Sequence, residues 1–393
     1  MKLSFKAAER LKSIKPSGIR RFFAAAQEIP SIINLSVGEP DFTPPMHALE
    51  GGWKATLAGK THYAPTNGIP ELREALAEKA YKEYGLEYDP NSEILITVGA
   101  TEAISLALMA LVNPGDEVLI PNPGFVCYEP SVRLVGGVPV SIPCLEKNKF
   151  KPTIDDVTSL ITGKSRVIIL NYPNNPTGVV LLRDELAELA KIAVDRDLIV
   201  ISDEVYEKII YDGEEHHCLA SFSGMRERTL VVNSFSKTYA MTGLRIGCVY
   251  GPKELIAPLW LCHQYFVACV DTFAQYAALA ALKGPQDFVK GMVAEFDRRR
   301  RFVFKRLNEI GGFDCVLPKG AFYMFPSIKA FGMSSEEFAE FLFKEARVAT
   351  VPGSAFGSYG EGYIRISYAA AYEQLEEALN RIEKAVGKLK GFF

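Results

Sequence analysis

Short apolar runs that alternate with segments of helical periodicity are the feature of this 393-residue sequence that most restricts its fold. The runs are EILITVG (93–99), DEVLIPNP (116–123), RVIILNYP (166–173), DLIVISDE (197–204) and TLVVNSFS (229–236). Helix-like stretches such as TEAISLALMALV and DELAELAKIAVD separate them. The runs are apolar on both faces, as expected of strands covered by helices on both sides. The sequence therefore predicts an α/β fold with a large, doubly wound, mainly parallel sheet.

The C-terminal part of the chain has a different pattern. It predicts a long helix over 288–311, strands over 320–326 and 362–369, and a closing amphipathic helix over 371–390. This pattern indicates a smaller α+β domain, completed by the N-terminal segment. We expect residues 1–48 to form an arm and part of the small domain, 49–285 the large domain and 286–393 the rest of the small domain.

Composition and charge exclude several functions. The net charge is −3 and the pI is about 6.1, so no broad positive field favours nucleic acid or an anionic membrane. The basic run DRRRR (297–301) lies in a helical pattern, and we interpret it as a solvated helix face. No apolar run is long enough to span a bilayer.

The cysteines and histidines give little evidence of a metal or disulfide framework. Seven cysteines form no C-x-x-C pair, which indicates free thiols in a reducing compartment, and the N-terminus is too charged for a secretory signal. We therefore expect a cytoplasmic protein. The five histidines show no metal-ligand spacing, so we predict no metal site.

Polar and aromatic side chains follow the apolar runs, where open parallel sheets bind ligands. They are Ala100 and Thr101 at a helix start, Phe125, Asn175, Asp203 with Tyr206, and Ser234, Ser236 and Lys237. Taken alone, Thr101 could be an N-cap, Asn175 a turn residue and Phe125 a core residue. Their common position at five strand ends favours a ligand site.

Three charged residues indicate the nature of that ligand. Asp203 ends an apolar strand, so we expect it to be buried and to need a cationic partner. Arg245 lies eight residues after Lys237 with a glycine between them, and two cations brought to one place imply a dianion.

The stretch SFSKTYAMTGLRIG (234–247) resembles the pyridoxal-phosphate lysine motif of class I aminotransferases, the aspartate aminotransferase family of fold type I. The similarity runs almost end to end. It includes NLSVGEPDF (34–42), THYAPTNGIPELREA (61–75), PNPGFVCYEP, NYPNNPTG, SDEVYEKIIYDG, GAFYMFP, VPGSAFG and GYIRISYA. The resemblance implies an aminotransferase that uses pyridoxal 5′-phosphate.

The resemblance also implies a role for each residue around the cofactor ring. Lys237 would form the Schiff base with the cofactor and then move the proton of the reaction. Asp203 would pair with the pyridine nitrogen. Tyr206 and Asn175 would hydrogen-bond the 3′ oxygen, and Phe125 would stack on the ring.

The cofactor phosphate and the substrate carboxylate have their own implied partners. Arg245, Ser234 and Ser236, with the backbone amides of Ala100 and Thr101, would bind the phosphate. Arg365 would bind the α-carboxylate of the substrate, together with Gly38 and Asn175. Tyr63 resembles the tyrosine that reaches the phosphate of the neighbouring subunit, which implies a homodimer.

The resemblance implies two substrates, an L-amino acid donor and a 2-oxo acid acceptor such as 2-oxoglutarate. Similar aspartate enzymes carry a lysine at the position of Thr101 for the distal carboxylate, and this chain does not. Lys15, Arg20 and Arg21 are the remaining cationic candidates, although solvated helix charges are an equal interpretation. An aromatic or broad-range aminotransferase is favoured.

Several alternatives stay open at this point. They are an aspartate aminotransferase, another fold type I enzyme such as a carbon–sulfur lyase or racemase, and a non-catalytic sensor.

Overall fold

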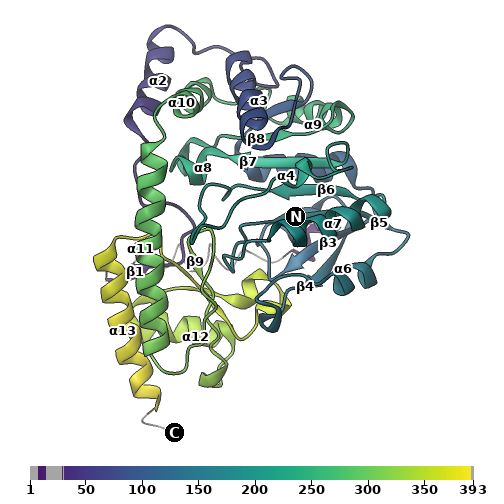
Figure 1. Cartoon of the computed structure of the whole chain (residues 1–393). Helices are drawn as coiled ribbons and strands as arrows, with labels where there is room; N and C mark the ends of the chain where they lie inside the picture. Colours follow the sequence, from purple (N-terminus) through teal and green to yellow (C-terminus); the bar gives the residue numbers. More distant parts are fainter. Residues whose placement is uncertain (1–7, 15–28, 30, 391–393) are drawn as a thin grey trace, which may run out of the picture.

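A computed structural model describes residues 8–14, 29 and 31–390. Its largest element is a seven-stranded sheet in the order β2-β8-β7-β6-β5-β3-β4 (Figure 1). The strands are β2 (Ile94–Thr97), β3 (Glu117–Asn122), β4 (Val138–Pro143), β5 (Ser165–Asn171), β6 (Ile199–Asp203), β7 (Thr229–Ser234) and β8 (Gly247–Tyr250). Neighbouring strands pair in parallel, except that β8 is antiparallel to both β2 and β7. The predicted α/β class and mainly parallel sheet are confirmed.

Strands β4 and β8 were not among the predicted apolar runs. Strand β4 contains Pro139 and Pro143 and lies at the edge of the sheet, where a missing N–H leaves no neighbour unpaired. Strand β8 has only four residues and begins at Gly247, the last residue of the lysine motif. Neither strand therefore carries the long apolar signal that marks the central strands.

Successive residues of the central strands point to opposite faces of the sheet, as the period of two requires. In β2, Leu95 packs with helix α4 (Gly99–Leu111), whereas Ile94 and Ile96 pack in a separate cluster on the other face. This arrangement explains why the runs are apolar throughout: both faces of the sheet are covered.

Helices cover the sheet on both faces. Helix α4 packs against β7, β8 and helix α9, and α2, α3 and α10 pack together at the β2 end of the sheet (Figure 1). The bounds are α2 (Met46–Leu57), α3 (Pro70–Tyr84), α5 (Tyr128–Leu134), α6 (Ile154–Leu160), α7 (Arg183–Asp195), α8 (Phe235–Thr238), α9 (Lys253–Phe266) and α10 (Thr272–Lys283). No helix among the described residues combines the length and apolarity needed to cross a bilayer.

The C-terminal part is built on helix α11 (Asp287–Glu309), with α13 (Tyr372–Lys390) packed along it (Figure 1). Helix α12 (Ser335–Phe341) and two small sheets complete it. The sheets are β11-β12-β9 and β1-β10, formed by β1 (Ile33–Asn34), β9 (Tyr323–Met324), β10 (Val348–Ala349), β11 (Val351–Pro352) and β12 (Ile364–Ser367). Strand β1 brings the N-terminal segment beside the C-terminal part, as predicted.

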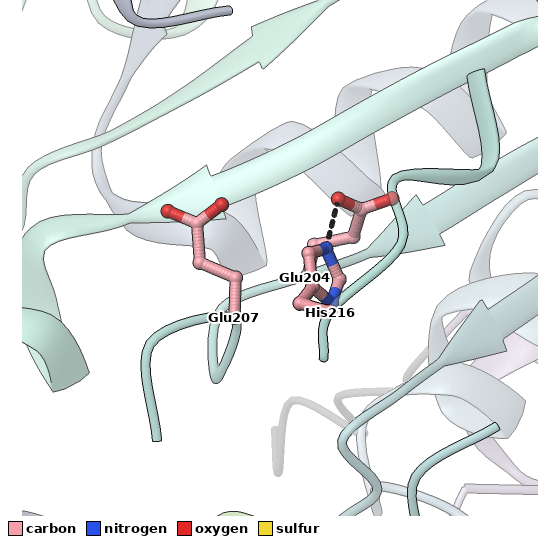
Figure 2. A group of neighbouring side chains, drawn as sticks. All are labelled: Glu204, Glu207 and His216. Carbon is pink, nitrogen blue, oxygen red and sulfur yellow. Dashed lines mark hydrogen bonds and ion pairs between the residues drawn. The ribbon is translucent and has the colours of Figure 1, made fainter. Parts of the chain in front are cut away.

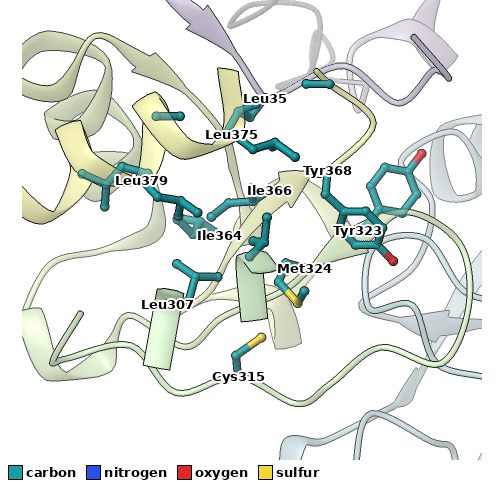
Figure 3. Close-up of a cluster of buried hydrophobic side chains, with 14 of the residues drawn as sticks. Leu35, Leu307, Cys315, Tyr323, Met324, Ile364, Ile366, Tyr368, Leu375 and Leu379 are labelled. Carbon is teal, nitrogen blue, oxygen red and sulfur yellow. The ribbon is translucent and has the colours of Figure 1, made fainter. Parts of the chain in front are cut away.

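The core of this part is a cluster of buried side chains beneath β12 (Figure 3). Ile364 and Ile366 of β12 pack with Leu307 of α11 and Leu379 of α13, and all four side chains are fully buried. This packing fixes β12, which carries Arg365, relative to both helices.

The interpretation of the basic run 297–301 as a solvated face is wrong for two of its arginines. Arg300 is fully buried and its Nη2 lies 2.7 Å from Asp212, while the buried Arg299 pairs with Asp41 at 2.7 Å. Arg298 and Arg301 remain exposed. Arg299 and Arg300 point inward because Asp41 and Asp212, acidic residues of distant segments, lie against α11. The periodicity of the helix sequence alone does not reveal these partners.

Candidate active site

A pocket at the carboxyl ends of the parallel strands contains every predicted site residue except Tyr63. Its lining includes Gly38, Ala100, Thr101, Phe125, Asn175, Asp203, Tyr206, Ser234, Ser236, Lys237, Arg245 and Arg365. The pocket is also lined by Glu39, Asn171 and Tyr323, among others. Tyr63 lies outside it, with 90% of its side chain exposed. Lys15, Arg20 and Arg21 lie outside the described residues.

Lys237 occupies the short helix α8, directly after β7. Ser234 caps this helix by accepting a hydrogen bond from the Ser236 amide, and Nζ of Lys237 donates a 2.6 Å hydrogen bond to the carbonyl of Gly38. Burial lowers the pKa of Lys237 to about 8, against the attraction of Glu39 and with help from the arginines nearby. A sizeable fraction of this amine is therefore neutral near pH 7.5, as a nucleophile requires.

Asp203 ends β6 and is 3% exposed. Burial raises the pKa of its carboxyl to about 6, although the phenol of Tyr128 donates a 2.6 Å hydrogen bond to Oδ2 and opposes the rise. In the described part of the chain no lysine, arginine or histidine forms an ion pair with Asp203. A buried acid in this state is suited to a cationic ligand atom.

Arg365 is the opposite case, a buried cation without a carboxylate. Its side chain is 1% exposed and donates hydrogen bonds to Oδ1 of Asn175 (2.9 Å) and to the carbonyl of Ser36 (2.6 Å). Its Nε has no partner, and burial lowers its pKa. Within the described ranges no acidic side chain pairs with it, so the guanidinium is suited to an anion that enters the pocket.

Arg245 and the start of helix α4 are suited to a phosphate. Helix α4 begins at Gly99, so Ala100 and Thr101 lie in its first turn, and Thr101 is not the N-cap that its type alone suggested. The amides of such a turn lack partners within the helix. Gly99 has φ +73°, and a Cβ there would collide with the guanidinium of Arg245, so glycine lets the arginine approach the helix start.

Three residues that support the pocket were missed in the sequence. Tyr128 donates to Asp203, Tyr323 shares a 2.7 Å hydrogen bond with Tyr206, and Asn171 donates a 3.0 Å bond to the carbonyl of Asp203. The two tyrosines resemble core residues in their sequence context. Asn171 could have been found, because it ends an apolar strand just as Asp203 does.

A buried group beside the pocket contains Glu204, Glu207 and His216, whose possible ligand atoms lie within 4.8 Å of one another (Figure 2). His216 lies 2.8 Å from Glu204, and Lys79 lies 2.7 Å from Glu207. Burial alone would lower the pKa values of His216 and Lys79, but the glutamates raise both. Because Lys79 and His216 lie within hydrogen-bond distance of the two carboxylates, we interpret the group as a buried polar network.

Comparisons with known proteins agree with this geometry. The family profile "Aminotransferase class I and II" matches residues 30–382. The aspartate aminotransferase of Pyrococcus abyssi is 50% identical over 98% of this chain and 99% of its own length. The aromatic-amino-acid aminotransferase 2 of Thermococcus litoralis is 49% identical, with the same coverage.

Solved structures show the same relationship. The aromatic aminotransferase of Pyrococcus horikoshii has a TM-score of 0.90 at 49% identity, covering 94% of this chain and 99% of its own. The aspartate aminotransferase of Thermus thermophilus with maleate has a TM-score of 0.93 at 38% identity, covering 97% of this chain and all of its own.

The fold and the pocket therefore define a fold type I enzyme that uses pyridoxal phosphate. The chain belongs to the class I and II aminotransferase family, and it is a pyridoxal-phosphate-dependent aminotransferase. The residues present suit that cofactor: a buried acid without a cation for the ring nitrogen, a lysine of lowered pKa, and an arginine at a helix start for the phosphate.

Proposed function

We propose that the protein transfers the amino group of aromatic L-amino acids, or of a broad range of L-amino acids, to a 2-oxo acid such as 2-oxoglutarate. The preference for aromatic donors over aspartate rests on the number of cations in the pocket. The pocket presents three cations among the described residues, Lys237, Arg245 and Arg365, and each has a partner in the cofactor or the α-carboxylate. None remains there for the side-chain carboxylate of an aspartate donor.

The apolar lining supports the same preference. Ile104, Phe125 and Val37 line the pocket. By the family resemblance, Thr101 occupies the position at which similar aspartate enzymes carry a lysine. An aromatic donor stacked on one ring would gain about 0.5–1.5 kcal/mol. An aspartate donor is the second candidate, because a relative of that name is as similar as the relative named for aromatic amino acids.

The cofactor, when bound, supplies a carbonyl that condenses with amines and a ring that withdraws electrons. Asp203 would keep the ring nitrogen protonated, which also gives this buried acid its missing partner. Tyr206 would donate to the 3′ oxygen, Asn175 would bind the same oxygen, and Phe125 would cover one face of the ring. Lys237 would hold the cofactor at rest and, once displaced by the substrate amine, carry a proton to and from the substrate Cα.

Two anion sites would orient the reacting groups. Arg245, the hydroxyls of Ser234 and Ser236 and the first turn of α4 would hold the phosphate. Arg365 would hold the α-carboxylate with Asn175, while Gly38 lies close enough to Lys237 for its segment to close over the substrate. Fixing both groups would hold the substrate Cα beside Lys237, so that the binding energy serves to orient the reacting atoms.

The proposed active unit is a homodimer in which Tyr63 of each subunit reaches the phosphate of the other. The exposure of Tyr63, 90%, supports this role, because a large aromatic side chain left in water is suited to an interface. The measured mass in solution tests it, together with a Tyr63→Phe variant that should bind cofactor less tightly. We further propose the division into a large domain over 49–285 and a small domain over the remaining residues, and a cytoplasmic location, which seven free cysteines support.

Half-reactions with each common L-amino acid, followed in a stopped-flow spectrophotometer, test the donor preference. We expect kcat/KM for phenylalanine and tyrosine to exceed that for aspartate at least tenfold. Thr101→Lys should reduce this difference by raising kcat/KM for aspartate, with Thr101→Ser as the matched control. Aspartate as the best donor of the unmodified protein would reject the aromatic preference and support the second candidate.

A further inference from the structure

We propose that Tyr323 is a positioning residue of the active site, whose hydroxyl orients the Tyr206 phenol and whose ring supports the Arg365 guanidinium. This inference rests on the proposed function, in which Tyr206 serves the cofactor and Arg365 the substrate. Tyr323 lies in β9 and contacts three of the residues that line the pocket: Gly38, Tyr206 and Arg365.

The contact with Tyr206 is a hydrogen bond between two phenols. Their oxygens are 2.7 Å apart, and their rings meet edge to face at a centroid distance of 5.8 Å. Tyr206 is 3% exposed and Tyr323 is 1% exposed. Each phenol has one hydroxyl proton. When Tyr206 donates a hydrogen bond to an oxygen of the ligand, Tyr323 must therefore be the donor in the hydrogen bond between the two phenols. Hydrogen bonds in such a chain strengthen one another.

The contact with Arg365 is made by the face of the ring. Cζ of Arg365 lies 4.4 Å from the centroid of Tyr323, and burial of both groups leaves little solvent to weaken this attraction. The ring therefore holds the guanidinium plane from one side while Asn175 and Ser36 hold its nitrogens. Together these contacts restrict the cation to one orientation before substrate arrives.

The third contact explains a glycine. A Cβ added at Gly38 would lie 2.5 Å from the hydroxyl oxygen of Tyr323, so a larger residue would push the phenol away from Tyr206. The segment that carries Gly38 also accepts the hydrogen bond of Lys237. Tyr323 is thus enclosed between this segment, the substrate arginine and the cofactor-binding tyrosine.

A purely structural role is the alternative, and Tyr368 provides the comparison. Both tyrosines belong to the same buried cluster (Figure 3). The hydroxyl of Tyr368 donates to the backbone carbonyl of Ala321 at 3.2 Å, and Tyr368 is absent from the pocket lining. Removing each hydroxyl costs stability, but only that of Tyr323 should alter the environment of the cofactor.

The test is a pH titration of the absorption band of bound pyridoxal phosphate in the full-length protein. Without Tyr323 as donor, the Tyr206 hydroxyl donates less strongly to the deprotonated cofactor oxygen. Tyr323→Phe should therefore raise the pH midpoint by about 0.4–1 unit, the equivalent of one hydrogen bond. Tyr368→Phe should leave the midpoint unchanged. In a Tyr206→Phe background, Tyr323→Phe should cause no further shift, because its effect passes through Tyr206.

A second variant tests the ring. Tyr323→Leu should raise KM for every amino donor about 3- to 30-fold above that of Tyr323→Phe, because the cation–π contact is lost. An unchanged midpoint in Tyr323→Phe, or a shift that persists without the Tyr206 hydroxyl, would overturn the positioning role of the hydroxyl. Equal KM values for the Leu and Phe variants would overturn the positioning role of the ring. A wild-type protein without any cofactor band would instead refute the proposed function itself.

Discussion

Nη1 of Arg365 donates a 2.9 Å hydrogen bond to Oδ1 of Asn175, a residue 190 positions earlier in the chain. The bond joins β12 of the C-terminal part to the loop that follows β5 of the large sheet. The two residues proposed to face the substrate carboxylate are therefore placed by each other, and a change at either one affects both.

Arg365→Ala should raise KM for every amino acid and 2-oxo acid alike. Loss of a charge-assisted hydrogen bond costs about 1.5–3 kcal/mol, which corresponds to about 10- to 150-fold. Steady-state kinetics with several donors measures the effect, and Arg298→Ala, which removes an exposed arginine, is the control. An increase confined to one donor would contradict the assignment of Arg365 to the shared carboxylate.

Asp203→Asn should stabilise the cofactor-free protein at pH 7. The carboxyl has a pKa of about 6 instead of its ordinary 3.8, so the folded state holds its proton more tightly, and stability is lost as pH rises from about 4 to 6. The loss is roughly 3 kcal/mol at pH 7. Urea unfolding at pH 4 and pH 7 should show the variant gaining only at the higher pH, while its cofactor affinity falls. Equal pH dependence in both proteins would be inconsistent with a buried, unpaired acid.

Arg245→Gln should weaken binding of pyridoxal phosphate about 10- to 100-fold. Binding of pyridoxal, which lacks the phosphate, should change little, so the ratio of the two affinities isolates the phosphate contact. Fluorescence titration measures both, with the exposed Arg301 replaced by glutamine as the control. Equal weakening for the two ligands would show that Arg245 acts on the fold of the pocket instead.

The rate at which cofactor-free protein captures pyridoxal phosphate should rise with pH around a midpoint near 8. Only the neutral amine of Lys237 is nucleophilic, and burial lowers its pKa to about 8. Stopped-flow absorbance across pH 6–10 follows the reaction. A rate that still rises without levelling off at pH 10 would indicate an ordinary, solvated lysine.

Much of the fold and of the pocket could be predicted from the sequence, for a physical reason. Strands that are buried on both faces are apolar throughout, so the polar residues at their ends, such as Asp203 and Lys237, stand out. The motif around Lys237 then identified the cofactor, and the family comparisons confirm it. The boundary near residue 285 stays a prediction.

The remaining features depend on contacts between distant segments. Tyr128 and Tyr323 are indistinguishable from core tyrosines until the fold brings them against Asp203 and Tyr206. Arg300 appears solvated until Asp212 is placed beside it. Strand β8 is too short for a periodic signal and is recognised only by its pairing with β2 and β7.

Borohydride reduction of the cofactor-loaded protein, followed by peptide mapping, tests whether Lys237 binds the cofactor covalently. We expect a yellow protein in which reduction adds the mass of the cofactor to the peptide that contains Lys237. A Lys237→Ala variant should bind the cofactor without fixing it and lose turnover by several orders of magnitude. Attachment of the cofactor at another lysine, or no attachment at all in a protein that still transaminates, would show that Lys237 is not the residue that binds the cofactor.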